Sequence, residues 1–111
     1  MSGRLVGEVL DHAPADLTPA DMLVLVALAN DARDHDRIAR FKSSVDVLAH
    51  RTRLSTGTVR NTLSRLVARG LIRPMIKTVH KGGKHQEYEI AKLSQSHRFA
   101  TLNGHERVTT R

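Results

Sequence analysis

The sequence predicts a small α+β domain that is mainly helical, with a three-helix core followed by a β-hairpin. Up to about residue 70 the apolar residues recur at helical spacing. The period then changes, and two stretches with β-strand character flank the tetrapeptide "KGGK". A length of 111 residues suits one domain with one modest core.

The composition narrows the class of protein. The sequence has no cysteine, which excludes disulfides, Cys-based zinc sites and thiol catalysis. Its longest apolar run, Met22–Ala29, is far shorter than the roughly 20 residues of a membrane span. The N-terminal residues lack the apolar stretch of a signal peptide. We therefore expect a soluble, cytoplasmic protein.

The net charge of +7 is unevenly distributed. Residues 1–36 carry two cations and seven carboxylates, a net charge of −5. Residues 37–111 carry sixteen cations and four carboxylates, a net charge of +12. Such a basic region on a small domain is typical of a protein that binds a polyanion, although a merely solvated basic surface is the alternative.

The first strong helix pattern follows an acidic segment. Residues 1–17 are expected to form an arm or a short helix. Thr18 is a good N-cap, Pro19 suits the first helical position, and Asp21 completes a capping box. The helix is expected to run from Pro19 to about Arg33.

This helix is apolar around its whole circumference, with Met22, Leu25 and Val26 among its apolar residues. A helix without a polar face is buried on all sides. Since a domain of this size can rarely surround one helix alone, we expect a homodimer in which the partner covers the remainder.

Two Ser-capped helices follow a charged loop and a short extended segment at Ile38–Phe41. Ser43 or Ser44 is expected to cap a helix over 45–51, and Ser55 to cap a longer one. In the longer helix Val59, Leu63 and Leu66 have the spacing of one buried face. Gly70 supplies its left-handed stop.

The hairpin is predicted to turn at Gly82 and Gly83. A continuous ladder about that turn puts Met75 on one face with Tyr88 and Ile90, together with Lys77 and Val79. Pro74 cannot donate a ladder hydrogen bond, so it implies an edge strand or a strand start. Residues 94–111 are expected to be a basic, flexible tail, with a short extra helix as the alternative.

The segment "SVDVLAHRTRLSTGTVRNTLSRLVARGLI" resembles the helix-turn-helix of small bacterial and phage winged-helix proteins. The preceding "LTPADMLVLVALAN" is similar to the opening helix of a subgroup found on prophages and plasmids. The resemblance covers residues 18–93 and implies a winged helix-turn-helix that binds DNA. One departure is Arg53, which stands at or next to the turn position where many such motifs carry Gly.

The third helix, 55–69, is the expected recognition helix because its polar face has no carboxylate. Arg can bond guanine, Asn can bond adenine, and Thr or Ser can serve either base in the major groove. The residues expected to read bases are Thr58, Arg60, Asn61, Ser64 and Arg65.

A second group of residues is expected to contact the DNA backbone. It comprises Ser43, Ser44, Arg51, Arg53, Ser55, Thr56 and Lys77. The wing, 77–85, is expected to reach the backbone or the minor groove through Lys81, Gly82, Gly83 and Lys84.

No cofactor, metal site or small-molecule ligand is expected. Histidines occur in Asp34–Asp36 and as His80 and His85, but no His-Glu-x-x-His spacing is present. Ser, His and Asp occur without a nucleophile elbow or a phosphate-binding glycine loop, so catalysis is not expected.

The leading hypothesis is a dimeric, sequence-specific regulator, a repressor of a mobile element or local operon that is associated with the nucleoid. The alternatives are a plasmid or phage replication, partition or architectural factor, and a protein–protein interaction module with the same fold. RNA binding is disfavoured because the chain has almost no aromatic stacking platform.

Overall fold

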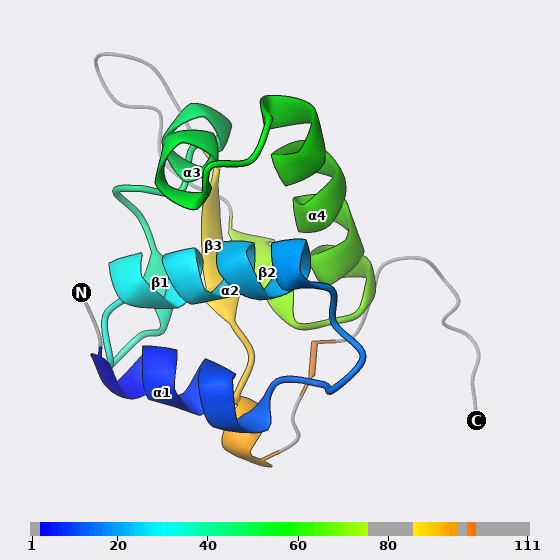
Figure 1. The fold of residues 1–111 in the computed structure, drawn as a ribbon. Coiled ribbons are helices and arrows are strands. Elements are labelled where there is room, and N and C mark those ends of the chain that lie inside the picture. Colours follow the sequence, from blue (N-terminus) through cyan, green and yellow to red (C-terminus); the bar gives the residue numbers. More distant parts are fainter. Residues whose placement is uncertain (1–2, 76–85, 96–97, 100–111) are drawn as a thin grey trace.

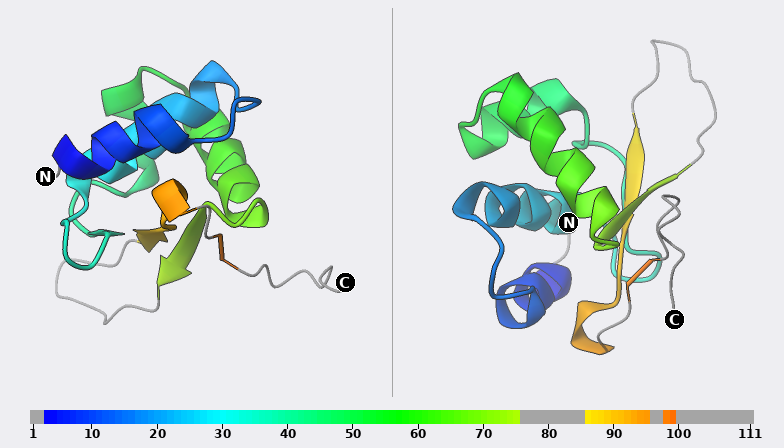
Figure 2. Two further views of the ribbon diagram at one scale, coloured as in Figure 1. Left: turned by 90° about the horizontal axis from the view of Figure 1, so that it is seen from below. Right: turned by 90° about the vertical axis from the view of Figure 1, so that its right-hand side faces the viewer.

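The computed structural model describes residues 3–75, 86–95 and 98–99. Four α-helices and three short strands make up most of this chain (Figure 1). In chain order the elements are α1 (Gly3–His12), α2 (Pro19–Asp31), β1 (Ile38–Ala39), α3 (Val45–Thr52), α4 (Thr56–Ala68), β2 (Ile72–Met75), β3 (Glu87–Ile90) and the 3₁₀ turn η1 (Leu93–Gln95). The antiparallel sheet has the order β1-β3-β2, and α2 and α4 lie on one of its sides (Figure 2). The expected small, mainly helical α+β fold is therefore confirmed.

Helix α1 lies along α2 and belongs to the packed fold (Figure 1). Of the two alternatives for residues 1–17, the structure adopts the short helix. Leu5 and Val9, four residues apart, are both fully buried in the core. These two apolar residues, one helical turn apart, anchor the helix in the core.

Helix α2 is the central helix of the core and begins as predicted. The Thr18 hydroxyl accepts a hydrogen bond from Asp21 N, and the Asp21 carboxylate accepts one from Thr18 N. The helix ends at Asp31, two residues earlier than expected. Among the described residues, no helix combines the length and apolar composition needed to cross a membrane.

The chain's own elements cover most of α2. It packs against α1, α3, α4 and the sheet, and Leu25 is fully buried. Met22 and Val26 are partly buried against the same core, while Leu23 is exposed. The burial of α2 therefore does not require a second chain, and the homodimer stays a prediction without this support.

The sheet register differs from the expected continuous ladder. Ile72 pairs with Ile90, and Met75 pairs with Glu87. Met75 therefore lies on the opposite face of the sheet from Ile90, and the predicted shared face is wrong. The observed register buries Ile72 and Ile90 together on the core side, which a slip by one residue would undo. The turn at Gly82 and Gly83 lies outside the described residues.

Strand β2 is an edge strand of the sheet, and it contains Pro74. The predicted edge position of this proline is therefore confirmed. An edge strand leaves one side of its backbone unpaired, so the missing N–H costs no ladder hydrogen bond there.

Helix α4 ends at Ala68, and Gly70 stops it in the manner that the sequence predicted. Gly70 has φ +74°, its N–H donates to Val67 O, and Leu71 N donates to Leu66 O. This pair of bonds is a Schellman motif, closed by the contact of two buried leucines. Gly70 O in turn accepts a hydrogen bond of 2.8 Å from Phe99 N.

Part of the predicted C-terminal tail belongs to the fold. Residues Leu93–Gln95 form η1, and Leu93 is buried. Phe99 is half-buried, and the Arg73 guanidinium lies 4.5 Å from the centre of its ring. The expectation of a flexible tail from residue 94 onward is wrong for these residues, because η1 packs against α1 and Phe99 docks on the end of α4 and on β2. Residues 100–111 lie outside the described part.

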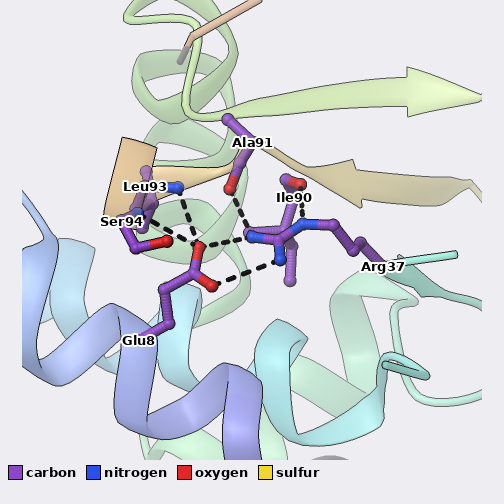
Figure 3. Close-up of polar contacts among 6 residues, drawn as sticks. All are labelled: Glu8, Arg37, Ile90, Ala91, Leu93 and Ser94. Carbon is purple, nitrogen blue, oxygen red and sulfur yellow. Dashed lines mark hydrogen bonds and ion pairs between the residues drawn. The ribbon is translucent and has the colours of Figure 1, made fainter. Parts of the chain in front are cut away.

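A buried ion pair joins the N-terminal helix to the end of the sheet (Figure 3). The Arg37 guanidinium donates to both carboxylate oxygens of Glu8, at 3.2 and 2.5 Å. It also donates to Ile90 O at 2.9 Å and to Ala91 O at 2.6 Å. Glu8 accepts a further hydrogen bond of 2.8 Å from Leu93 N. Every charged oxygen and most of the guanidinium donors thus have partners.

The pKa of Glu8 reflects two opposed effects. Burial raises the pKa, but the hydrogen bonds and the charge of Arg37, with the amides of Leu93 and Ser94, lower it below its usual value. A carboxyl group whose pKa is lowered by folding stabilises the protein above its unfolded pKa. That stabilisation is lost as the pH falls through the folded pKa.

Replacing Gly70 by Ala should destabilise the protein by at least about 1 kcal/mol, because a left-handed residue is required there. A Cβ at this position would also meet Phe99 O at 2.4 Å. Urea unfolding of Gly70→Ala measures the loss. The control is Gly57→Ala in the first turn of α4, where the nearest atom is 4.0 Å away. It should leave stability unchanged or raise it by up to about 1 kcal/mol. Equal losses in both variants would contradict the role of Gly70.

Replacing Glu8 by Gln should destabilise the protein by about 3 kcal/mol at pH 7, since it leaves a buried guanidinium without its counter-charge. The difference from the wild type should persist above about pH 4.3 and shrink at lower pH, as Glu8 of the wild type becomes protonated. Urea unfolding across this pH range measures it. Asp11→Asn, on an exposed position of the same helix, is the control. A difference that did not depend on pH would contradict the ionic role.

Candidate nucleic-acid interface

Helices α3 and α4 are joined by a tight turn. Ser44 caps α3 by accepting a hydrogen bond from Val47 N at 3.2 Å. The turn residue Arg53 has φ +65°, the left-handed conformation that Gly adopts most readily. Arg53 therefore occupies a turn position of the kind at which many helix-turn-helix motifs carry Gly. Its side chain is exposed.

Helix α4 separates into a buried and an exposed face. Val59, Thr62, Leu63 and Leu66 are buried against the core. The exposed residues of the helix are Thr56, Gly57, Arg60, Asn61, Ser64, Arg65 and Ala68. The sequence of α4 has no carboxylate, so this face is cationic and rich in hydrogen-bonding groups.

Three of the predicted base-reading residues lie together on this exposed face. Ser64 stands four residues after Arg60 and three after Asn61, so all three share one side of the helix. Within residues 3–75, 86–95 and 98–99, Arg60 makes no ion pair. Its guanidinium is therefore available to an external acceptor. We call Gly57, Arg60, Asn61 and Ser64 the α4 outer face.

Thr58 has a structural role that the sequence did not predict. It is half-buried, and its N–H donates to Ser55 Oγ at 3.1 Å. Its hydroxyl accepts a hydrogen bond of 2.9 Å from the same Ser55 Oγ. Both hydroxyl groups are thus occupied by the helix cap, and Thr58 lies beside the α4 outer face rather than on it.

Arg65 forms an ion pair with Asp21 of α2 and is not part of the α4 outer face. Its Nε and one terminal nitrogen lie 3.2 and 2.8 Å from Asp21 Oδ1, and the same nitrogen donates to Thr62 Oγ1. The pair is asymmetric, because the Asp21 side chain is 6% exposed and that of Arg65 is 50% exposed. Arg65 therefore has a partner within the protein, and its base-reading role stays a prediction. Asp21 stands at the start of α2, and its second role as an ion partner was not evident from its capping role.

The pKa of Asp21 lies below its usual value, which favours the ionised carboxylate. Burial raises this pKa. The hydrogen bond and charge of Arg65 and the hydrogen bonds with Thr18 lower it by more, so the net shift is downward. The pair therefore joins the C-terminal half of α4 to the N-terminus of α2. A second ion pair, between Arg69 and Asp16 at 2.8 Å, lies next to it along the chain.

The predicted backbone contacts are found in different environments. Ser43 is only 1% exposed and donates to Gln86 O at 2.8 Å, so it cannot reach a phosphate and this expectation is wrong. Arg51 is exposed and donates to Asn30 Oδ1 at 2.7 Å. Arg53, Ser55 and Thr56 are exposed around the start of α4. The remaining candidates, Lys77, Lys81, Gly82, Gly83 and Lys84, lie outside the described residues.

The N-terminus of α4 is the more favourable of the two helix starts for an anion. Its first turn has no acidic residue, whereas α3 has the exposed Asp46 in its first turn. Backbone N–H groups and the helix dipole favour negative charge at such an end. The neighbouring Arg53 adds a full positive charge.

A metal centre is not formed by the described residues. Among them, no group of three His, Cys, Asp or Glu side chains is arranged to hold an ion. His80 and His85 lie outside the described part of the chain.

Comparison with known proteins gives no family for this chain. No protein-family model, no curated protein and no solved structure matches it.

Replacing Arg65 by Ala should destabilise the protein by about 0.5–1 kcal/mol, since a half-exposed ion pair is screened by solvent. The loss should be smaller at high salt. Replacing Arg60 by Ala should change stability by less than about 0.5 kcal/mol, because this side chain has no partner in the described structure. Urea unfolding of both variants at low and high salt measures the difference. A larger loss of stability in Arg60→Ala than in Arg65→Ala would contradict the structural role of Arg65 and the outward position of Arg60.

Proposed function

We propose that the protein binds double-stranded DNA sequence-specifically, with the α4 outer face in the major groove. The observation that carries the proposal is the exposed, acid-free face of α4 with Arg60, Asn61 and Ser64 in a row. The three-helix core with its antiparallel sheet is compatible with the winged-helix resemblance of the sequence. The charge of +12 over residues 37–111 supports a polyanionic partner.

The chemistry of the outer face suits base edges. Arg60 can donate two hydrogen bonds to a guanine, and Asn61 can donate to and accept from an adenine. Ser64 can serve either base, and Gly57 lets the helix approach the groove closely. Arg53 and the free N–H groups at the start of α4 suit the adjacent phosphates.

The role that we propose is that of a transcriptional regulator, a repressor of a mobile element or local operon. A symmetric dimer would present two copies of α4 about 34 Å apart and would favour a pseudo-palindromic site. In the described part of the chain, Leu10 on α1 and Leu23 on α2 are large apolar residues that are exposed. Either helix can supply a dimer contact.

Selection of bound duplexes from a random pool tests the proposal. Recovery of one conserved site supports sequence-specific binding, and an inverted repeat supports a dimer. Cooperative coating of any long duplex would instead favour the replication, partition or architectural role. If micromolar protein did not retard a mixed-sequence duplex at about 50 mM salt, the DNA-binding proposal would be overturned, and a protein–protein module would take its place.

Replacing Arg60 or Asn61 by Ala should cost roughly 1–3 kcal/mol of binding free energy on the selected site and little on mixed-sequence DNA. The physical reason is that a base-edge contact discriminates sequence, whereas a phosphate contact does not. Fluorescence anisotropy with both duplexes measures it. Arg4→Ala, which removes an exposed cation from α1, is the matched control and should have little effect on either duplex. Equal losses on both duplexes would sink the base-reading assignment.

A further inference from the structure

The connection between β1 and α3 presents an aromatic ring to solvent. The side chain of Phe41 is 64% exposed, which makes it the most exposed large apolar residue of the described chain. The other two aromatic residues, Tyr88 and Phe99, are partly buried against the core. A single exposed apolar side chain is ordinary on a protein surface, so the surroundings of Phe41 decide whether it marks a contact.

The ring is held in place rather than carried on a loose loop. Asp31 Oδ2 accepts hydrogen bonds from Phe41 N at 3.0 Å and from Lys42 N at 2.9 Å. The Arg33 guanidinium lies 5.8 Å from the centre of the Phe41 ring. The next residue, Ser43, is buried and bonded to Gln86 O at the start of β3. Because the backbone around Phe41 is fixed on both sides, little conformational entropy remains to be lost on binding.

Two positively charged side chains are exposed to solvent beside the ring. Arg33 and Lys42 are both exposed beside it. Two of the nearby carboxylates are engaged within the protein, since Asp31 is buried on the two amides and Asp36 pairs with Arg40 at 2.7 Å, whereas Asp34 next to Arg33 is exposed. An apolar ring flanked by two cations complements the sugar edges and phosphates of a nucleic acid.

The position of this connection fits a duplex already held by α4. The connection lies on the far side of α3 from α4 (Figures 1 and 2). Helix α3 has 8 residues and is therefore about 12 Å long. The centres of the major groove and the next minor groove are about 17 Å apart along B-DNA, half of the helical repeat of about 34 Å. If the axis of α3 runs along the duplex, its length covers most of the distance between the two grooves.

We propose that Phe41 makes an apolar contact with the minor groove that flanks the major groove occupied by α4, with Arg33 and Lys42 on the adjacent phosphates. Apolar side chains that enter a minor groove contact or partly unstack a base step. The contact rests on the proposed DNA binding. It extends the interface beyond the recognition helix to Phe41, which precedes the helix-turn-helix in the chain.

A single-tryptophan protein tests the contact directly, because the sequence contains no Trp. In Phe41→Trp, added duplex should quench the tryptophan emission and protect it from acrylamide. In the control Ala15→Trp, which places the reporter on an exposed position between α1 and α2, both properties should stay unchanged. Equal responses at the two positions, or no response of Phe41→Trp when anisotropy shows the duplex to be bound, would overturn the contact.

Two truncations separate the ring from its neighbouring charge. Phe41→Ala should weaken duplex binding about tenfold, comparable to the loss of one aromatic contact with a base, and should leave the salt dependence unchanged. Lys42→Ala should reduce the slope of log K against log salt by about one, since one phosphate contact is lost. Unfolding of both variants should match the wild type because both side chains are exposed.

The outcomes distinguish this contact from the proposed function itself. If the wild type does not bind duplex DNA, the proposed function fails together with the contact. If the wild type binds and Phe41→Ala binds equally well, only the Phe41 contact fails. If Phe41→Ala instead turns a dimer into a monomer in light scattering without DNA, Phe41 is a protein contact and the inference is overturned.

Discussion

The arrangement of the helices around the sheet depends on the ion pair and the hydrogen bonds of the Arg37 guanidinium. It bonds Glu8 of α1 and the carbonyl groups of Ile90 and Ala91, where the chain leaves β3. Arg37 itself precedes β1 and has φ +62°, a conformation that costs an ordinary residue about 1–2 kcal/mol. One side chain therefore joins three segments that are far apart in the sequence, and its hydrogen bonds offset the strain of its backbone.

The physical constraint is that a charge removed from water must find all of its partners inside the protein. Glu8 meets this constraint by accepting from Arg37 and from the amides of Leu93 and Ser94. The same carboxylate thus attaches α1 to both the start and the end of the sheet. With these segments in place, α2 is enclosed, and α4 has a firm surface on which to pack its apolar side.

Helix α4 shows how the same charge type takes two different roles. Arg60 and Arg65 are five residues apart, but a rotation of roughly 100° per residue turns them to different sides of the helix. Arg65 meets the carboxylate of Asp21 and belongs to the packing of α2 against α4. Arg60 meets no partner within the described residues and remains outward. The proposed base-reading surface is therefore narrower than the polar face that the sequence of α4 predicts. The proposed contact of Phe41, which lies between β1 and α3, extends the interface beyond this helix.

The sequence by itself determined the features that depend on neighbouring residues. The caps at Thr18 and Ser55, the stop at Gly70 and the acid-free face of α4 arise from residues within one or two turns of each other, so local hydrogen bonding and helical period suffice to predict them.

Only the tertiary structure decided the features that depend on distant residues. Helical period cannot show that Asp21 holds Arg65, that Ser43 is buried against Gln86, or that Ile72 rather than Met75 pairs with Ile90. Each of these contacts depends on which segments, 18 to 44 residues apart in the chain, become neighbours when the core closes. Burial of apolar surface and the pairing of buried charges decide this, and neither leaves a local pattern in the sequence.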